Sequence, residues 1–307
     1  LGFTANRTMR VAQQLYEGID TGAGAVGLIT YMRTDSVTLA QEAIAELRGY
    51  IQQHFGRDNL PPSPRTYKTR AKNAQEAHEA VRPTSAERAP ASVKRALNEE
   101  QFRLYELIWR RTVACQMIHA TIDTVAVDLK CGATGEHDEQ LRANGSTVAN
   151  PGFMVVYEES SDDKSAAESE RRLPPMAQGD VLELKEFCSE QHFTEPPPRY
   201  SEASLIRTLE DFGIGRPSTY AAIISTLQNR EYVELDRRRF TPTDVGRVVN
   251  TFLTEHFSDY VDYEFTARLE DSLDAVSRGE REWIPLMSEF WGTFHRRVEE
   301  KNETVTR

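Results

Sequence analysis

The spacing of apolar residues changes twice along this chain, and these changes limit the folds that it can adopt. Up to about residue 117 the apolar side chains recur at helical intervals, as in the segment 99–117. From Thr121 they alternate with polar side chains over residues 122–129, which is typical of a strand. Helical intervals return after the three consecutive prolines 196–198, which stiffen the chain and mark a boundary. The sequence therefore predicts an α+β fold that is mainly helical, with a β-rich middle between helical ends.

The predicted elements fall into three domains. We expect a helical first domain over residues 1–122, a β-rich segment over 123–198 and a helical domain over 199–307. Periodicity and capping residues predict helices over residues 6–17, from a cap at Asp35 or Ser36 to Ile51, and over 99–117, 202–212, 218–230, 243–256, 265–277 and 282–300. A short apolar run predicts a strand over residues 27–32. The change of period from Thr121 predicts strands over 122–129, 153–157 and 181–187, and a hairpin is expected over 232–241.

Charge is distributed unevenly along the sequence. The 307 residues have a net charge of -11, which at first argues against a polyanionic partner. Residues 123–198 hold 16 acidic and 6 basic side chains, whereas residues 1–122 hold 16 basic and 12 acidic ones, and residues 199–250 hold 8 basic and 7 acidic ones. The acidity is therefore local, and the two flanking regions can bind nucleic acid.

Cysteine usage and hydropathy restrict the class of protein further. The 3 cysteines are odd in number and widely spaced, which argues against a disulfide framework and against a zinc site. No run approaches the ~18 apolar residues that a membrane span needs. A reducing cytoplasm fits best. Because the chain begins at Leu1 rather than at Met, we expect it to be a piece of a larger protein.

The first segment that carries chemistry is ITYMRTDS, residues 29–36. Tyr31 offers a phenol as nucleophile, and Arg33 offers a cation that can neutralise charge developing on a phosphate. If the segment is extended, both side chains point to the same face. The alternative is an ordinary aromatic residue at the edge of a core, with its hydroxyl hydrogen-bonded.

The second segment is AQEAHEAVRPT, residues 74–84. On a helical turn Gln75, His78 and Arg82 lie on one face, so that an imidazole and a guanidinium are presented together before Pro83 ends the turn. The alternative is a plain helix end with a solvent-exposed histidine.

The third segment spans residues 205–233. Two glycines end one helix and Pro217 begins the next, with Arg216 before it and the hydroxyls of Ser218 and Thr219 beside its exposed N–H groups. A helix N-terminus of this kind is a phosphate site. The alternative is the turn of a helix-turn-helix regulator. The segment is not a P-loop, because it lacks the Gly-Lys-Ser or Gly-Lys-Thr ending.

Taken together, the three segments resemble the type IA DNA topoisomerases and, within them, the bacterial topoisomerase I branch. The matching stretches are GLITYMRTDS at residues 27–36, EAHEAVRP at 76–83 and GIGRPSTYA at 213–221, in the family's order. The GIGRPST form is similar to topoisomerase I or to the topoisomerase half of reverse gyrase. The resemblance spans nearly the whole chain and weakens in the acidic middle.

The resemblance implies a role for particular residues. Tyr31 would attack a phosphodiester of single-stranded DNA and form a 5′-phosphotyrosine linkage, with Arg33 stabilising the phosphate and His78 aiding binding and cleavage. Opening of a toroid would then relax negatively supercoiled DNA without ATP. A monomeric cytoplasmic enzyme associated with the nucleoid is expected. The expected DNA-binding residues are Arg82, Arg216, Ser218 and Thr219.

The resemblance also implies a cofactor that this chain does not hold. The family binds Mg²⁺ through a D-x-D-x-E cluster in an N-terminal TOPRIM domain, and no such cluster occurs in these 307 residues. We therefore expect no metal site here, only half of the family's β-rich arch, and no DNA relaxation by this chain alone.

Two other functions remain open at this point. The chain could be a non-catalytic helix-turn-helix DNA-binding protein that uses Arg216 and the helix of Ser218, although this leaves the ITYMRTDS segment unexplained. It could also be a structural or partner-binding fragment in which Tyr31 is merely packed.

Overall fold

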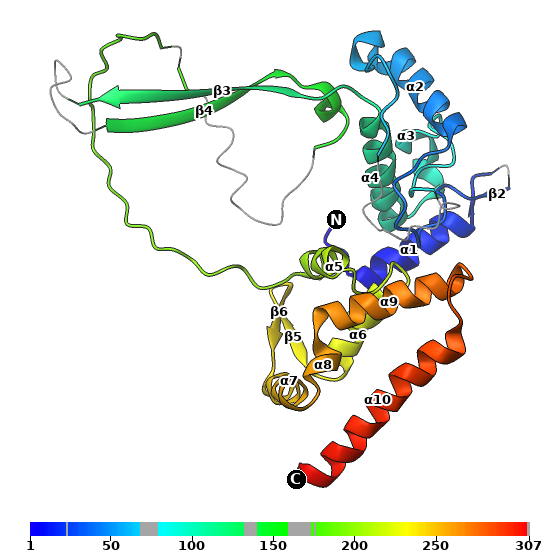
Figure 1. The fold of residues 1–307 in the computed structure, drawn as a ribbon. Coiled ribbons are helices and arrows are strands. Elements are labelled where there is room, and N and C mark those ends of the chain that lie inside the picture. Colours follow the sequence, from blue (N-terminus) through cyan, green and yellow to red (C-terminus); the bar gives the residue numbers. More distant parts are fainter. Residues whose placement is uncertain (23, 68–78, 132–139, 159–172, 175, 306–307) are drawn as a thin grey trace.

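The structure is a computed structural model that describes residues 1–22, 24–67, 79–131, 140–158, 173–174 and 176–305. A helical first region leads into a long two-stranded hairpin, and an extended connection returns from the hairpin to a second helical region (Figure 1). The predicted α+β, mainly helical fold is confirmed.

The first region is built from helices and one short hairpin. Its elements are α1 (Ala5–Glu17), β1 (Ile19–Asp20), β2 (Ala25–Val26), α2 (Gln41–Phe55), η1 (Arg57–Asn59), α3 (Pro90–Val93), η2 (Lys94–Ala96) and α4 (Glu99–Cys115). The predicted helices over 6–17 and 99–117 are confirmed to within two residues. The start of α4 is set by a capping box, in which the side chain of Asn98 accepts from the N–H of Gln101 and the Gln101 side chain accepts from the N–H of Asn98.

The main core lies between these helices. Leu15 of α1, Ile51 of α2 and Tyr105 of α4 are fully buried. The polar groups of the buried aromatic side chains are hydrogen-bonded. The Trp109 indole N–H donates to the carbonyl of Ala86 at 2.9 Å, and the Tyr105 hydroxyl donates to the carbonyl of Arg88 at 2.6 Å. The first region is therefore a packed unit that can hold a site on its surface.

The β-rich middle is a two-stranded antiparallel hairpin. Strand β3 (Thr121–Lys130) pairs with β4 (Gln140–Asn150), and Arg142 binds Asp128 across the strands at 2.6 Å. The predicted strand over 122–129 is confirmed. Its partner was not predicted, because QLRANGSTVAN lacks the apolar alternation that indicates a strand.

Two other predicted strands are wrong. Residues 153–157 lie instead in and just after the short helix η3 (Gly152–Val155), because Gly152 has a positive φ of 48° and approaches the His119 backbone so closely that a Cβ would lie 2.4 Å from its carbonyl oxygen. Residues 181–187 are exposed and have no regular structure. A strand needs a neighbour for its backbone hydrogen bonds, and no described segment pairs with this one.

The second helical region follows the predictions closely. Its elements are α5 (Glu202–Asp211), α6 (Tyr220–Asn229), β5 (Val233–Asp236), β6 (Arg239–Pro242), α7 (Asp244–His256), α8 (Ser258–Val261), α9 (Tyr263–Ser277) and α10 (Trp283–Thr304). Helix α6 begins two residues later than predicted, because the N–H groups of Thr219 and Tyr220 both turn back to the carbonyl of Arg216. No helix among the described residues is both long and apolar enough to cross a membrane.

Two glycines in helices provide a matched test of this packing. A Cβ on Gly246 of α7 would lie 2.0 Å from the carbonyl oxygen of Tyr232, at the start of the β5–β6 hairpin, whereas a Cβ on Gly292 of α10 would meet nothing within 4 Å. We expect Gly246→Ala to lower the free energy of unfolding by about 2 kcal/mol through overpacking. Gly292→Ala should raise it by about 0.5–1 kcal/mol through helix propensity. Urea denaturation measures the free energy of unfolding of both variants. A change of the same sign in the two variants would contradict this account.

Candidate active site

The segment that carries Tyr31 is extended and is held by the segment that precedes α3. Leu28 and Ile29 are fully buried. The N–H of Thr30 donates to the carbonyl of Arg82 at 2.9 Å, and the N–H of Thr84 donates to that of Leu28 at 3.0 Å. The predicted strand over 27–32 is reduced to one bridge, between Ile29 and Pro83, because the N–H of Leu28 donates to the Leu15 carbonyl at 2.8 Å and the N–H of Arg82 donates to the Thr30 hydroxyl at 2.9 Å. The first two motifs therefore lie side by side.

Exposure alternates at the end of this segment. Met32 is buried at 7% exposure, while Tyr31 at 41% and Arg33 on its other side are exposed. The ring of Tyr31 meets that of Tyr16 edge to face, with centroids 5.4 Å apart. Arg33 makes no hydrogen bond or ion pair with any described residue. The phenol and the guanidinium thus both lie on the outer side of the segment.

The residues after Arg33 are not a helix, so the predicted cap at Asp35 or Ser36 is wrong. The Thr34 hydroxyl accepts from the N–H of Ser36 at 3.0 Å, and the Ser36 hydroxyl accepts from the N–H of Thr38 at 3.2 Å. The carbonyl of Thr38 accepts from Ala80 at 2.8 Å. These local and cross-segment bonds compete with helix formation, and α2 begins only at Gln41.

Of the second motif, the structure describes only its end. Gln75 and His78 lie outside the described residues, so the prediction for His78 stays a prediction. The predicted helical turn does not reach Arg82, since this residue lies on the segment bonded to Thr30. The Arg82 guanidinium is 15% exposed and donates to Glu79 Oε2 at 2.5 Å and to the Pro83 carbonyl at 2.9 Å.

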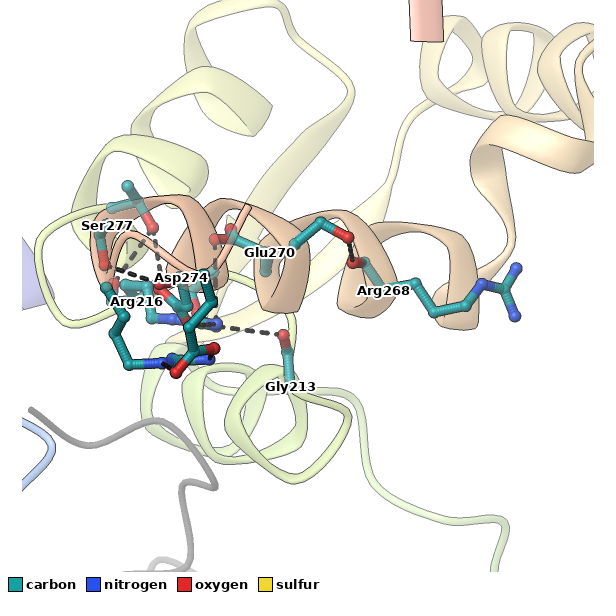
Figure 2. A network of polar contacts seen from close by, with 11 residues as sticks. Gly213, Arg216, Arg268, Glu270, Asp274 and Ser277 are labelled. Carbon is teal, nitrogen blue, oxygen red and sulfur yellow. Dashed lines mark hydrogen bonds and ion pairs between the residues drawn. The ribbon is translucent and has the colours of Figure 1, made fainter. Parts of the chain in front are cut away.

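The third motif is organised around Arg216. Its Nη2 donates to Asp274 Oδ2 of α9 at 2.6 Å, and Nη1 donates to the carbonyls of Gly215 at 2.8 Å and Gly213 at 3.3 Å (Figure 2). Glu270 lies 4.0 Å from Nη1. Burial opposes the charged form, but the hydrogen bond and the charge of Asp274 prevail and raise the pKa of Arg216. Both glycines have positive φ, 72° and 76°, which bends their carbonyls around the guanidinium.

The two hydroxyls of the motif differ in their use. Thr219 Oγ1 accepts from the N–H of Arg216 at 2.9 Å and donates to the Arg216 carbonyl at 3.1 Å, so it closes the turn before α6. Ser218 is exposed and its hydroxyl has no hydrogen bond to a described residue. The Ser218 hydroxyl is therefore open to a ligand.

The second helical region docks against α1 and comes near the first motif. Asn6 of α1 donates to the Ser225 hydroxyl of α6 at 2.7 Å. Burial, helped by the negative charges of Glu210 and Asp35, raises the pKa of Tyr220 to about 12 against the opposing charge of Arg216. Asp35 of the first motif is thus a neighbour of Tyr220 in the third, although 185 positions separate them in the sequence.

Sequence reasoning missed the acidic partners of Arg216. Glu270 and Asp274 stand one helical turn apart in LEDSLD and so share a face of α9, but this pattern is also that of any solvated helix. Among the described ranges, no group of three or more His, Cys, Asp or Glu side chains is arranged to hold a metal ion.

Comparisons with known proteins agree with one another. A family model described as DNA topoisomerase matches residues 1–288. The chain is 55% identical over 99% of its length to DNA topoisomerase 1 of Xylella fastidiosa strain Temecula1, and it spans 37% of that protein. It is 52% identical over 99% of its length to DNA topoisomerase 1 of Rickettsia felis, and it spans 38% of that protein. The solved full-length topoisomerase I from Thermotoga maritima matches 96% of this chain with a TM-score of 0.75 and 33% identity, over 46% of its own length.

The Arg216–Asp274 pair can be tested through stability. We expect Arg216→Ala and Asp274→Ala each to lower the free energy of unfolding by about 1–3 kcal/mol, because each leaves a half-buried charge without its partner. The double variant should lose about 1–2 kcal/mol less than the sum of the losses of the two single variants.

Thermal and urea unfolding provide the measurement. Glu264→Ala, which removes an exposed pair with Arg268 on the same helix, is the control and should change stability by less than about 0.5 kcal/mol. Additive losses would mean that the pair is not coupled.

Proposed function

Because this chain belongs to the bacterial DNA topoisomerase I family, we propose that it carries the strand-cleaving tyrosine of a type IA DNA topoisomerase. The observation that supports this most is the exposed phenol of Tyr31 beside the exposed guanidinium of Arg33, which pairs with none of the described residues, on a segment whose preceding residues are buried. A nucleophile held in this way needs little reorganisation before it reacts. The chain spans about two fifths of its relatives, so the tests below use the full-length protein.

In the proposed reaction the Tyr31 hydroxyl attacks the phosphorus of one phosphodiester in single-stranded DNA. A bond forms between the phenolic oxygen and phosphorus, the bond to the 3′ oxygen breaks, and the 3′ oxygen takes up a proton as the phenol loses one. Arg33 neutralises the charge that grows on the phosphoryl oxygens. One phosphoester replaces another of similar energy, so that religation needs no ATP. His78 is proposed to aid binding and cleavage.

DNA would be held next to Tyr31 by the third motif. The exposed Ser218 hydroxyl is proposed to contact the backbone directly, with Thr219 and Arg216 shaping the turn that presents it. Arg216 keeps its Nε donor free of described acceptors and so retains a donor for phosphate. Arg82 is proposed to act mainly by holding its own segment next to Thr30, because its guanidinium already forms an ion pair with Glu79.

The wider activity follows from the family. We propose that the full-length protein relaxes negatively supercoiled DNA as a monomer associated with the nucleoid. A requirement for Mg²⁺, which the resemblance implies, remains a prediction for the full-length protein, since no three His, Cys, Asp or Glu side chains cluster for a metal ion among the described residues.

Two alternative functions have less support. A helix-turn-helix regulator needs α6 free to enter a major groove, but Ser225 of α6 is bonded to Asn6 of α1 and the helix is mostly half-buried. A purely structural role for Tyr31 does not account for a phenol that is 41% exposed next to an exposed arginine.

The assignment of Tyr31 predicts the effect of removing one hydroxyl. Tyr31→Phe should reduce the covalent DNA–protein adduct on the order of 1,000-fold or more, since no other group can form the ester. Single-strand affinity should stay within about twofold, because the ring is kept. Transfer of end-labelled DNA to the protein on a denaturing gel measures the adduct, with Tyr16→Phe as the control. Normal adduct formation by Tyr31→Phe would falsify the assignment.

Arg33 can be tested by separating rate from affinity. Arg33→Lys keeps a positive charge but loses the planar pair of donors, so it should slow single-turnover cleavage by about tenfold to 100-fold while affinity changes by less than about threefold. Arg33→Ala should be slower still. Rapid-quench cleavage and equilibrium binding are compared for both variants. Equal losses in rate and affinity would reduce Arg33 to a positioning contact.

A further inference from the structure

The turn between β5 and β6 is formed by two arginines in an unfavourable backbone conformation. Asp236 pairs with Arg239, so Arg237 and Arg238 alone close the hairpin. Both have positive φ, 47° and 66°. A two-residue turn with these angles favours Asn-Gly, and a side chain as large as that of arginine rarely adopts them. The two residues thus carry strain that an ordinary turn sequence would avoid.

Both arginines are also unpaired among the described residues. Their side chains are exposed, and neither makes a hydrogen bond or ion pair with a described residue. The Arg238 guanidinium lies over Gly2, where an added Cβ would stand 2.8 Å from Nη1. Strain that persists at neighbouring positions, without a compensating hydrogen bond or ion pair to a described residue, points to a function for the side chains themselves.

Two more arginines lie next to this turn. The carbonyl of Arg199 accepts from Arg239 Nη1 at 2.6 Å, so the backbone of Arg199 lies within reach of the strand that leaves the turn. Arg103 of α4 donates to the carbonyl of Leu1 at 3.0 Å, next to Gly2. We call Arg103, Arg199, Arg237 and Arg238 the arginine cluster. It joins three segments that are distant in sequence, through the contacts of Arg103 with Leu1, of Arg238 with Gly2 and of Arg239 with Arg199. Helix α5 and the N-terminus lie close together in Figure 1.

We propose that the arginine cluster binds the phosphodiester backbone of DNA at a distance from the cleaved bond. Guanidinium groups suit phosphate because their paired donors match its oxygens. The choice of DNA as the polyanion rests on the proposed function. The arginine cluster lies at the start of helix α1, whereas Tyr31 contacts Tyr16 near the end of that helix. Because α1 has 13 residues, the distance between the cluster and Tyr31 is about 20 Å. At about 3.4 Å per nucleotide of B-form strand, the contact lies about six nucleotides from the bond attacked.

The test replaces the strained turn by its favoured sequence. In the full-length protein, Arg237→Asn with Arg238→Gly removes two charges and relieves both positive-φ strains. Melting temperature should therefore rise by about 2–4 °C. Affinity for a single strand of about 25 nucleotides should fall about twentyfold at 0.1 M salt, and the slope of log K against log salt should decrease by about 1.4. A strand of about four nucleotides, too short to reach the cluster from Tyr31, should bind as before.

A charge-matched control separates this contact from general electrostatics. Arg247→Gln with Arg296→Gln removes two exposed arginines of α7 and α10 that have no described partner. It should leave the affinity for the long strand and the salt slope near those of the parent protein. Unchanged affinity of the turn variant, or an equal loss in the control or on the short strand, would overturn the proposal, as would a lower melting temperature.

The measurements distinguish an error in the arginine-cluster proposal from an error in the proposed function. If the parent protein forms the Tyr31 adduct and the turn variant binds the long strand unchanged, only the arginine cluster is wrong. If the parent protein forms no adduct, the proposed function itself is wrong, and the binding data then report only on the cluster.

Discussion

The pairing of residues 28–30 with residues 82–84 is the constraint on which the candidate site depends. Leu28 and Ile29 are fully buried, so the chain cannot rotate there without exposing apolar surface. Backbone hydrogen bonds to Arg82 and Thr84 on the neighbouring segment prevent it from sliding. Tyr31 follows directly and is therefore presented outward from a rigid base.

Docking of the second helical region completes the site. The Asn6–Ser225 hydrogen bond ties α1 to α6, and the effect of Asp35 on Tyr220 reports that the first and third motifs are neighbours. Glu210, Glu270 and Asp274 lie near this junction, and Arg216 forms an ion pair with Asp274. Its bond to Asp274 fixes the turn before α6 and leaves the exposed Ser218 hydroxyl for a ligand.

Most of the helices could be predicted from sequence because their signals are local. The capping box at Asn98 and the glycines at 213 and 215 specify helix ends without reference to the rest of the chain. The predicted strands over 153–157 and 181–187 failed because a strand requires a partner, and apolar alternation does not say whether one is present. Strand β4 was missed for the converse reason, since pairing with β3 organises a polar sequence.

The sequence by itself determined which residues can do chemistry here: a tyrosine, a histidine, three arginines and two hydroxyls in three recognisable segments, together with the helical ends and the family that they imply. Only the tertiary structure decided how these residues are used. It paired the first segment with the second and set Arg82 against Glu79, and it gave Arg216 an acidic partner on α9. The physical reason is range: helix caps and periodicity act over a few residues, whereas ion pairs, burial and strand pairing join residues that are dozens to hundreds of positions apart.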